Sequence, residues 1–510
     1  MLMNRRIQKD CESSCDYVLP DYMGDIRKVL TARAKCMPSP SFADDTGVSV
    51  GGSVEYEIIY ADSENKLTAI NTSSDYEFKS AVADASGAEL IDSGRVSNLS
   101  VRITGPRKVS LRSVVNVSVT VSCEGGANIE GDGLGEGDNV ERITRELEDM
   151  RVRRYSSGER EYAEQAERLR GVKSDEVEII VSGGSVRISE TEPVEGGVRI
   201  KGELIITALV RTPDEAVLMI RRAIPFEETV STEGVGEGAF FTADGVVTSA
   251  AIGVNDDGEE CVLVANAIAE FYVSAYSNEK VELTLDAYLP EFDSRCEYDE
   301  FSATSITACQ NFELEIKEKY EREAIGLSDV SEVLCMACEV RSYSFERDED
   351  GMRLVGEIAV SGIACEKNVD GSRSYMPIKM QVPFSENVNV SCQIGDGDRV
   401  DVNMDAVECT LLFDEGEALL KCTAAISLLV KREERVRALS LFERGEKLED
   451  CCGYKITVYY PTCGEGLFDV AKKFHTTRAR LALDNSLAEE ALSSSDSPDS
   501  LLGVKRLIIK

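Results

Sequence analysis

The sequence predicts a mainly β multidomain protein: three β-rich repeats followed by a small α+β (βααβ) module. Three observations predict this class. A set of sequence markers recurs about every 150 residues, apolar and polar residues alternate within each copy, and one short stretch near residue 470 has helical spacing. The chain has 510 residues, 43% of them hydrophobic, which is enough apolar material for several cores.

The repeat rests on two kinds of marker whose spacings agree. A glycine-led apolar segment occurs three times, with spacings of 150 and 154 residues, and an aspartate-led segment upstream recurs with the same two spacings. A period of this length is the size of a whole domain, so we expect separate units strung together rather than a stacked solenoid. The first residues of the markers are Gly52, Gly202 and Gly356, and Asp25, Asp175 and Asp329.

Each repeat shows the pattern of antiparallel strands. Residues 53–60 alternate between polar and apolar side chains, which is the period of a half-buried strand. Clusters of Gly, Asn and Asp such as residues 255–258 indicate hairpin turns. We therefore expect each repeat to be a β-sandwich or a barrel-like stack of sheets, with a short helix at its beginning.

These patterns give predicted boundaries. The repeats are expected at 1–125, 141–308 and 309–450, and the C-terminal module at 453–510. Residues 126–140 are rich in Gly and acidic residues and are expected to be a flexible linker. The charged stretch 140–170 mixes Arg and Glu, which predicts a solvated helix stabilised by ion pairs one turn apart.

The charge of the chain argues against several classes of protein. Lys and Arg total 56 against 93 Asp and Glu, a formal net charge of −37. Nucleic acids and anionic membranes need a cationic surface, so neither is an expected partner. No apolar stretch approaches the roughly 20 residues of a membrane helix, and no apolar region follows the basic N-terminal residues. We expect a cytoplasmic protein without membrane insertion.

Catalytic and metal chemistry have little support in the sequence. The 16 cysteines are expected to be reduced thiols, mostly buried in strands. Cys335 and Cys338 have a metal-like spacing, but zinc needs four ligands and there is no second such pair. His475 is the only histidine and so the only candidate base for a hydrolase triad, and its position just past the predicted first helix of the C-terminal module favours a surface residue. We expect no enzymatic activity, no metal and no cofactor.

Two segments of the first repeat carry a family resemblance. Residues 17–26 read Tyr-Val-Leu-Pro-Asp-Tyr-Met-Gly-Asp-Ile, and residues 107–115 begin with Arg-Lys. Together they resemble the entry motif and the later Arg-Lys strand of SPOCS domains. The second and third copies keep the aspartate and the glycine-led strand without the Leu-Pro-Asp-Tyr element, so their assignment depends on the internal repeat.

The C-terminal module resembles a LysM module. Residues 456–474 suit a first strand, a glycine turn and a first helix, whose Leu467, Val470, Ala471 and Phe474 fall on one helical face. Residues 502–509 resemble the closing strand. Glu465-Gly466 stands where the family has Asp-Thr, and Phe468 where it has Trp, which favours protein docking over sugar binding. The resemblance implies a binding groove formed by Cys463, Gly464, Glu465, Gly466, Leu467, Phe468, Asp484 and Asn485.

Three SPOCS-like repeats plus a LysM-like module resemble the architecture of clostridial spore coat morphogenetic proteins. The resemblance implies a scaffold in the mother-cell cytoplasm at the forespore surface. Its expected partner, bound through the LysM-like module, is the spore coat morphogenetic ATPase. The alternative is a LysM protein that binds peptidoglycan or cortex.

Overall fold

The structure is a computed structural model that describes most of the chain. Within the described residues it is mainly β and contains several separate sheets, as the sequence predicts. Most of the predicted linker at 126–140 lies outside the described residues. Those residues are 3–82, 88–123, 139–236, 238–257, 260–348, 351–368, 372–390, 394–395, 397–414, 416–448, 456–462, 464–487, 501 and 504–510.

Three units of six strands share one topology. In each, the first, sixth and fifth strands form one antiparallel sheet in that order, and the second, third and fourth strands form another. The two sheets enclose a core of inward-facing residues, so each unit is a β-sandwich. The first unit comprises β1 (Met3–Val18), β2 (Ile26–Asp44), β3 (Gly47–Asp62), β4 (Leu67–Ser80), β5 (Glu89–Gly105) and β6 (Lys108–Cys123).

The second and third units repeat this arrangement with some longer strands. The second comprises β7 (Glu141–Arg170), β8 (Glu178–Val194), β9 (Gly197–Arg211), β10 (Val217–Ser231), β11 (Phe240–Asp257) and β12 (Glu260–Tyr288). The third comprises β13 (Phe292–Glu321), β14 (Val330–Asp348), β15 (Gly351–Lys367), β16 (Arg373–Val388), β17 (Asp398–Asp414) and β18 (Glu417–Lys447). The third unit therefore begins at Phe292, and the predicted boundary at 308/309 falls inside β13.

The predicted helix over 140–170 is wrong, because this stretch is strand β7. It pairs with β12 along its whole length. Its apolar residues Leu147, Met150 and Val152 are buried. Of the charged residues between them, Glu148 is exposed, Arg151 is partly exposed and Asp149 is buried. Charge pairs alone do not separate a solvated helix from a strand, and the long partner strand β12 decides the outcome.

The short helix expected at the beginning of each repeat, near its aspartate-led marker, is also largely wrong. In the first and third units the marker leads directly into strands β2 and β14. Only the second unit has a helical turn there, the 3-10 helix η1 (Ser174–Glu176) before β8. β-Branched and other apolar residues that alternate with polar ones follow each marker, and they favour a half-buried strand.

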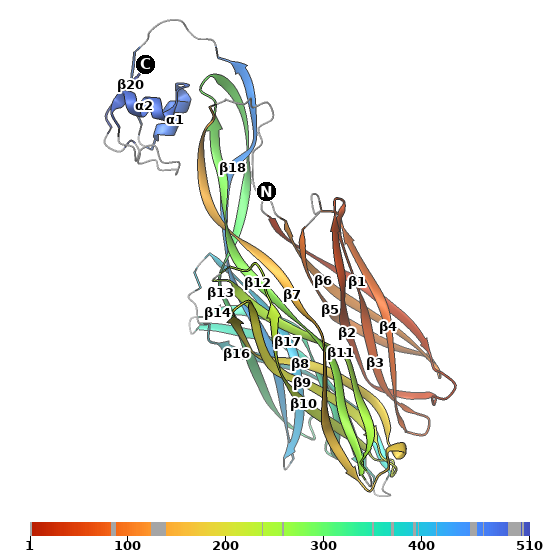
Figure 1. Ribbon diagram of the computed structural model, residues 1–510. Coiled ribbons are helices and arrows are strands. Elements are labelled where there is room, and N and C mark those ends of the chain that lie inside the picture. The colour runs from red at the N-terminus through yellow and green to blue at the C-terminus, as the bar shows by residue number, and fades with distance from the viewer. Residues whose placement is uncertain are drawn as a thin grey trace.

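A stalk rises from the body because four strands extend beyond the sandwiches (Figure 1). The first half of β7 pairs with the second half of β12, and the first half of β13 pairs with the second half of β18. These two ribbons pack face to face through a separate apolar core. The core of the stalk comprises Leu147, Leu283, Ala303, Val436 and Ala438.

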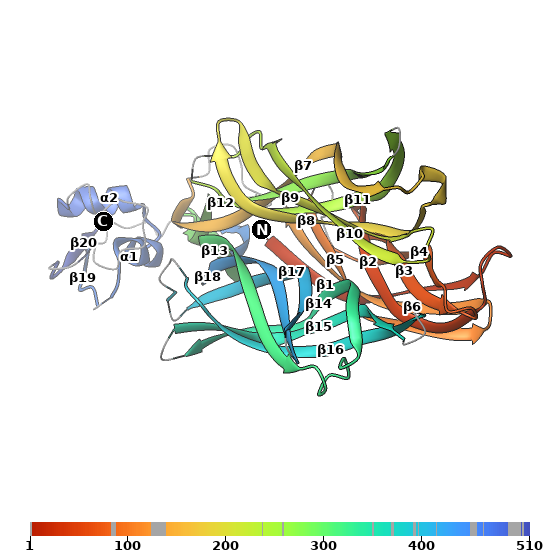
Figure 2. The ribbon, with the colours of Figure 1, turned by 90° about the horizontal axis from the view of Figure 1, so that it is seen from below.

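The three units are not separate along the chain as expected, because they share a buried apolar cluster. Seen from below, the units surround a common centre (Figure 2). Ile59, Leu209 and Ile363 occupy the same position in the three repeats and are all buried in this cluster. We call this set the junction core; it comprises Leu30, Ile59, Ala61, Leu67, Val181, Leu209, Val217, Leu334, Cys335, Ile363 and Cys365.

The last elements are two short strands and two helices at the end of the stalk. β19 (Thr457–Tyr459) pairs antiparallel with β20 (Leu507–Ile509), and α1 (Leu467–Lys473) and α2 (Arg478–Asn485) lie between them in sequence. We refer to residues 456–510 as the terminal module. Among the described residues, the helices are all too short and too polar to span a membrane.

The junction core predicts how the units are coupled. Leu209→Ala removes a side chain that is 2% exposed and is expected to lower the free energy of unfolding by about 3 kcal/mol. Met219→Ala, at the cross-strand neighbour that is 38% exposed, is the matched control and should cost under about 1 kcal/mol. Urea unfolding of the full chain measures both. Equal effects of the two substitutions would contradict a shared core.

Candidate functional site

The predicted groove begins at a glycine turn that enters α1. Gly464 has φ +90°, a left-handed conformation that favours glycine, and a Cβ there would meet open space. Gly466 is the N-cap residue, and its amide donates to Asp469 Oδ2 at 2.8 Å. Cys463 lies outside the described residues. The turn is thus closed by backbone and carboxylate hydrogen bonds that also start the helix.

Glu465 is turned toward its own module. Its carboxylate accepts hydrogen bonds from the Tyr459 hydroxyl and the Thr462 amide, both at 2.8 Å. These hydrogen bonds, led by the one from the Thr462 amide, lower the pKa of Glu465. The Glu465 side chain therefore fastens the turn to β19, and its ionised form is the one that the fold stabilises.

Leu467 and Phe468 are buried, at 1% and 4% exposed. The Phe468 ring packs edge-to-face against Tyr288 at the end of β12, with 5.1 Å between ring centroids. The Tyr288 hydroxyl donates to the Thr476 carbonyl at 2.8 Å. Phe468 is therefore a contact between the module and the stalk, and it is not presented to solvent as a groove residue.

Two ion pairs fix the same side of the module to the stalk. Lys472 Nζ lies 2.6 Å from Asp286 Oδ2, and Arg478 Nε lies 2.8 Å from Glu141 Oε2. The second pair is largely shielded, with 16% and 13% of its side chains exposed. Partial burial strengthens such a charge-assisted pair when both partners are present. The helical face of the module is thus occupied by the chain itself.

Asp484 and Asn485 hold α2 to β20. Asp484 pairs with Lys510 at 3.2 Å. Asn485 accepts from the Ile508 amide at 2.6 Å and donates to the Ile508 carbonyl at 2.8 Å. The two halves of the predicted groove are therefore held by different strands of one sheet. Glu465 is hydrogen-bonded to β19, and Asn485 is hydrogen-bonded to β20.

The opposite face of this small sheet is apolar and exposed, a feature that sequence reasoning missed. Val458 and Ile508 are register partners that point away from the helices. The partly buried Tyr459 packs against Phe474 on the inner side. We call the exposed set the apolar strip; it comprises Ile456 (71% exposed), Val458 (49%), Tyr460 (66%) and Ile508 (36%).

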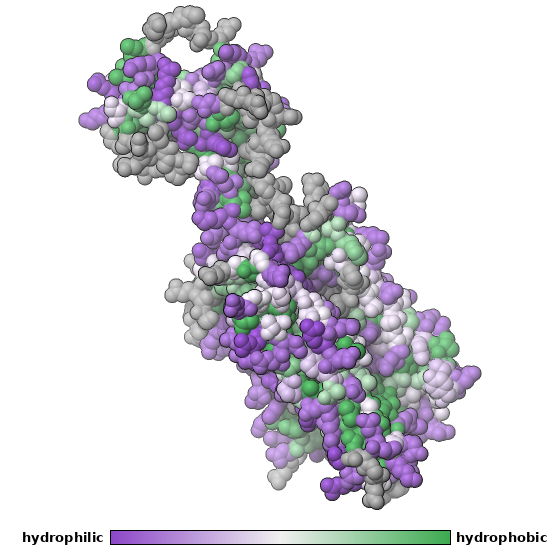
Figure 3. Space-filling view, in the orientation of Figure 1, coloured by the Kyte–Doolittle hydropathy of each residue, from purple (hydrophilic) through white to green (hydrophobic). Residues whose placement is uncertain are grey.

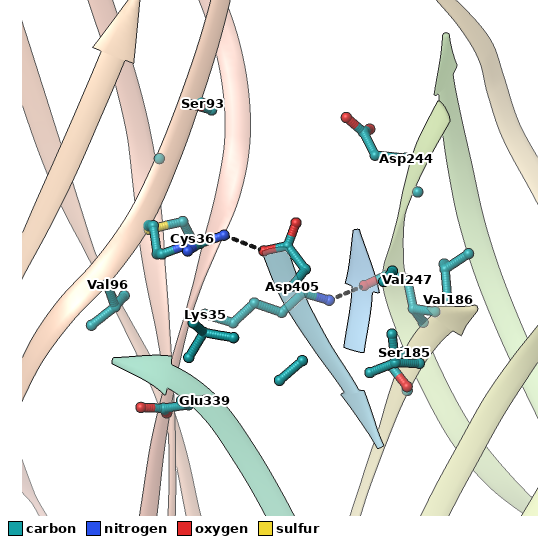
Figure 4. A pocket seen from close by; sticks show the side chains of 18 of the residues that line it. Lys35, Cys36, Ser93, Val96, Ser185, Val186, Asp244, Val247, Glu339 and Asp405 are labelled. Carbon is teal, nitrogen blue, oxygen red and sulfur yellow. Dashed lines mark hydrogen bonds and ion pairs between the residues drawn. The ribbon is translucent and has the colours of Figure 1, made fainter. Parts of the chain in front are cut away.

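A second candidate site lies between the three units. A cavity of about 1160 Å³ is lined by residues of all three sandwiches, several of them ionisable (Figure 4). Lys35 on β2 of the first unit donates a hydrogen bond to the Val247 carbonyl on β11 of the second unit at 3.0 Å. Burial lowers the pKa of Lys35, because the charged ammonium has lost much of its water.

Several ionic groups of the cavity pair across unit boundaries. Arg95 of the first unit pairs with Asp405 of the third at 2.5 Å, and Arg221 of the second pairs with Glu408 of the third at 2.7 Å. Arg154 pairs with Asp244 and also donates to the Asp92 carbonyl of the first unit. This arrangement acts as a polar joint that fixes the units relative to one another.

The described residues show no arrangement for metal ligation: no three His, Cys, Asp or Glu side chains in them are grouped to hold an ion. Cys335 and Cys338, the one metal-like pair in the sequence, lie on β14 beside the cavity. His475 has φ +50° just after α1.

The surface of the body and stalk in one view is mostly hydrophilic, with apolar residues in scattered patches (Figure 3).

Comparisons of the chain with protein-family models, with curated proteins and with solved structures found no match.

The packing of Tyr288 predicts how the module is held. Tyr288→Ala removes the ring that faces Phe468 and the hydrogen bond to Thr476, so the amides of α1 are expected to exchange with solvent at least tenfold faster. Tyr460→Ala, at an exposed tyrosine of the same module, is the control and should leave exchange unchanged. Hydrogen exchange with mass spectrometry measures both. Unchanged exchange in Tyr288→Ala would show that the ion pairs alone hold the module.

The lowered pKa of Glu465 predicts acid sensitivity. The unfolded value is near 4.5 and the folded value is lower, so the stabilisation is complete above about pH 5 and is lost as the pH falls through the folded pKa. Glu465→Gln should remove this pH dependence from the unfolding of the terminal module. The tyrosine signal of the module, followed from pH 7 to pH 3 in both proteins, tests this. Parallel curves would contradict the assigned role.

Proposed function

We propose that this protein is a non-enzymatic scaffold in spore coat assembly and that it docks to the spore coat morphogenetic ATPase through its LysM-like terminal module. It would act in the mother-cell cytoplasm at the forespore surface. The resemblance of residues 17–26 to SPOCS domains and of residues 456–474 to LysM modules motivates the proposal. The element order β19, α1, α2, β20, with the two strands paired, agrees with a LysM-like module.

The apolar strip is the observation that carries the proposal. Within the described part of the chain nothing covers the face of the small sheet that carries Ile456, Val458 and Tyr460, and exposed aromatic and branched residues are typical of protein interfaces. The other face of the module is committed to the stalk through Phe468 and Lys472. A partner that binds the module in its docked position therefore has the strip as its apolar contact surface.

Charge supports a protein partner with an acidic rim. Lys505 and Arg506 are exposed and directly precede β20, beside the strip. In a chain of net charge −37 these cations are a local exception. Opposite charges around an apolar centre accelerate association and select the partner. The body and stalk would hold this surface away from the acidic sandwiches.

The experiment is co-purification of the ATPase with the tagged full-length protein from sporulating cells. Val458→Glu together with Ile508→Glu places two carboxylates in the strip and is expected to lower recovery of the ATPase at least tenfold. Tyr22→Ser, at a tyrosine of the first unit that is 87% exposed, is the control and should retain it. Removal of residues 453–510 should also abolish recovery.

Two outcomes would contradict the proposal. Retention of the ATPase by the truncated protein would place the docking site elsewhere. Sedimentation of the full-length protein with purified peptidoglycan or cortex, without recovery of the ATPase, would favour the alternative function of a wall-binding LysM protein.

A further inference from the structure

The cavity between the three sandwiches, which we call the inter-unit cavity, contains two cations of the first unit. Arg33 and Lys35 lie two residues apart on β2, so their side chains are on the same face of the strand, and both line the cavity. Arg33 Nη2 donates to Cys335 Sγ of the third unit at 3.2 Å, and Lys35 donates to the Val247 carbonyl of the second unit. The two side chains therefore connect all three units.

The guanidinium of Arg33 has donors without good acceptors. It carries five N–H groups, and the thiol sulfur of Cys335 is a weak acceptor. The register partner of Arg33 is Glu57, but Glu57 Oε1 lies 3.7 Å from Arg33 Nη1, which is too long for a hydrogen bond. Arg33 Nε is buried and has no hydrogen-bond partner among the described residues. Burial raises the pKa of Glu57 against the opposing charge of Arg33, so this carboxylate compensates the guanidinium only in part.

The ammonium of Lys35 has no ion-pair partner in the described part of the chain. It has three N–H donors, and its one acceptor there is the Val247 carbonyl at 3.0 Å. Its register partner Glu55 is exposed. Glu339, which occupies the equivalent position in the third unit, pairs instead with Arg341 at 3.3 Å. Lys35 is therefore a partly buried cation with unused donors.

The second unit has small residues beside these two cations. Gly183 and Ser185 stand where the first unit has Arg33 and Lys35, and both line the cavity. A Cβ added at Gly183 would meet Glu57 Oε2 at 3.7 Å, so the glycine itself leaves space there. The Ser185 hydroxyl has no hydrogen-bond partner among the described residues, and Lys35 and Ser185 border the cavity from different units (Figure 4). Space and a further donor thus accompany the two cations.

The charge of the cavity differs from that of the rest of the chain. The lining contains seven Lys and Arg against eight Asp and Glu, whereas the whole chain contains 56 against 93. An anion therefore meets less repulsion in the cavity than elsewhere on the protein. The remaining cations of the lining each have a carboxylate at 3.9 Å or closer; they are Arg6, Arg95, Arg154, Arg221 and Lys431.

The cavity has the size and the access that an organic molecule needs. Its volume of about 1160 Å³ is slightly above the range of ordinary ligand pockets, roughly 300–1,000 Å³. Arg6 and Glu55 line it and are exposed, so the cavity opens to solvent. Val96 and Val186 are among its apolar lining residues (Figure 4). This lining suits a molecule with one charged end and a less polar body.

We propose that the inter-unit cavity binds a small organic oxyanion, a carboxylate or a phosphate ester, whose charged end lies between Arg33 and Lys35. A planar guanidinium matches two oxygens of either group, and an ammonium adds a point charge. The ligand oxygens would supply the acceptors that these two cations lack. Because the site draws on all three units, the bound molecule would also hold the units together, whatever partner the terminal module binds.

The test is isothermal titration calorimetry of the full-length protein with two probes, inorganic phosphate and succinate. The buffer contains no other oxyanion, and sodium chloride keeps the ionic strength constant. We expect at least one probe to bind at one site per chain with a Kd on the order of 1 mM. Binding of phosphate alone would assign a phosphate ester as the ligand, and binding of succinate alone would assign a carboxylate. The thermal midpoint of the protein should rise with the concentration of the bound probe.

Variants copied from the other repeats locate the site. Arg33→Ala takes its residue from Ala337, and Lys35→Ser takes its residue from Ser185, so both side chains are compatible with the sandwich. Each substitution is expected to weaken binding at least tenfold, because a charged donor is lost. Lys28→Met removes an exposed cation of the same strand outside the cavity and is the matched control, which should bind as the unsubstituted protein does.

A third variant keeps every charge of the cavity. Ser185→Ala removes one neutral donor and is expected to weaken binding about threefold. If circular dichroism shows that Arg33→Ala does not fold, Lys35→Ser and Ser185→Ala decide the result. The proposal is overturned if neither probe binds to the unsubstituted protein. It is also overturned if the folded cavity variants bind as tightly as Lys28→Met, since the anion would then occupy another site.

Discussion

The junction core is the constraint on which the rest of the structure depends. Ile59, Leu209 and Ile363 face away from the interior of their own sandwiches and would be exposed in any unit standing alone. Burial of large apolar residues is worth about 2 kcal/mol each, so three equivalent surfaces gain most when they meet at one centre. A single contact between two units would leave the third surface in water. The closed arrangement of three follows from this need, and it makes the body a stable base for the stalk.

Polar groups at the contacts between units lose hydration when they are buried. This loss is offset only when the neighbouring unit supplies their hydrogen-bond partners. Arg211 of the second unit, 4% exposed, donates to the Leu67 carbonyl of the first unit at 2.5 Å. Such groups lose water on burial and need their partner from the neighbouring unit. The apolar centre brings the units together, and the polar contacts between units specify the position of each unit. The long strands β7 and β13 then leave this body side by side, which gives the terminal module a fixed support.

The sequence predicts correctly that the chain is mainly β with repeated sheets, because this depends on local periodicity and on spacings that can be counted. It does not predict strand β7, since its alternating charges satisfy a helix as well as a strand until the partner β12 is known. The junction core was equally hidden: an apolar residue such as Leu209 has the same appearance whether its neighbours belong to its own unit or to another. In the terminal module the period of β19 was evident, but not which face is covered, since that depends on Phe474 and on the stalk residue Tyr288.

The residues that line the inter-unit cavity differ between the three copies, and this difference explains why one repeat cannot take the place of another. At one position beside the cavity the three units carry Arg33, Gly183 and Ala337, and two residues further along they carry Lys35, Ser185 and Glu339. Three arginines at equivalent positions would place like charges together in a region with little water, at a cost of several kcal/mol. A single Arg33, with Glu57 within 3.7 Å and with small residues opposite, fits the space without this repulsion. The fold can therefore be repeated three times, but the chemistry at the centre has to differ in each copy.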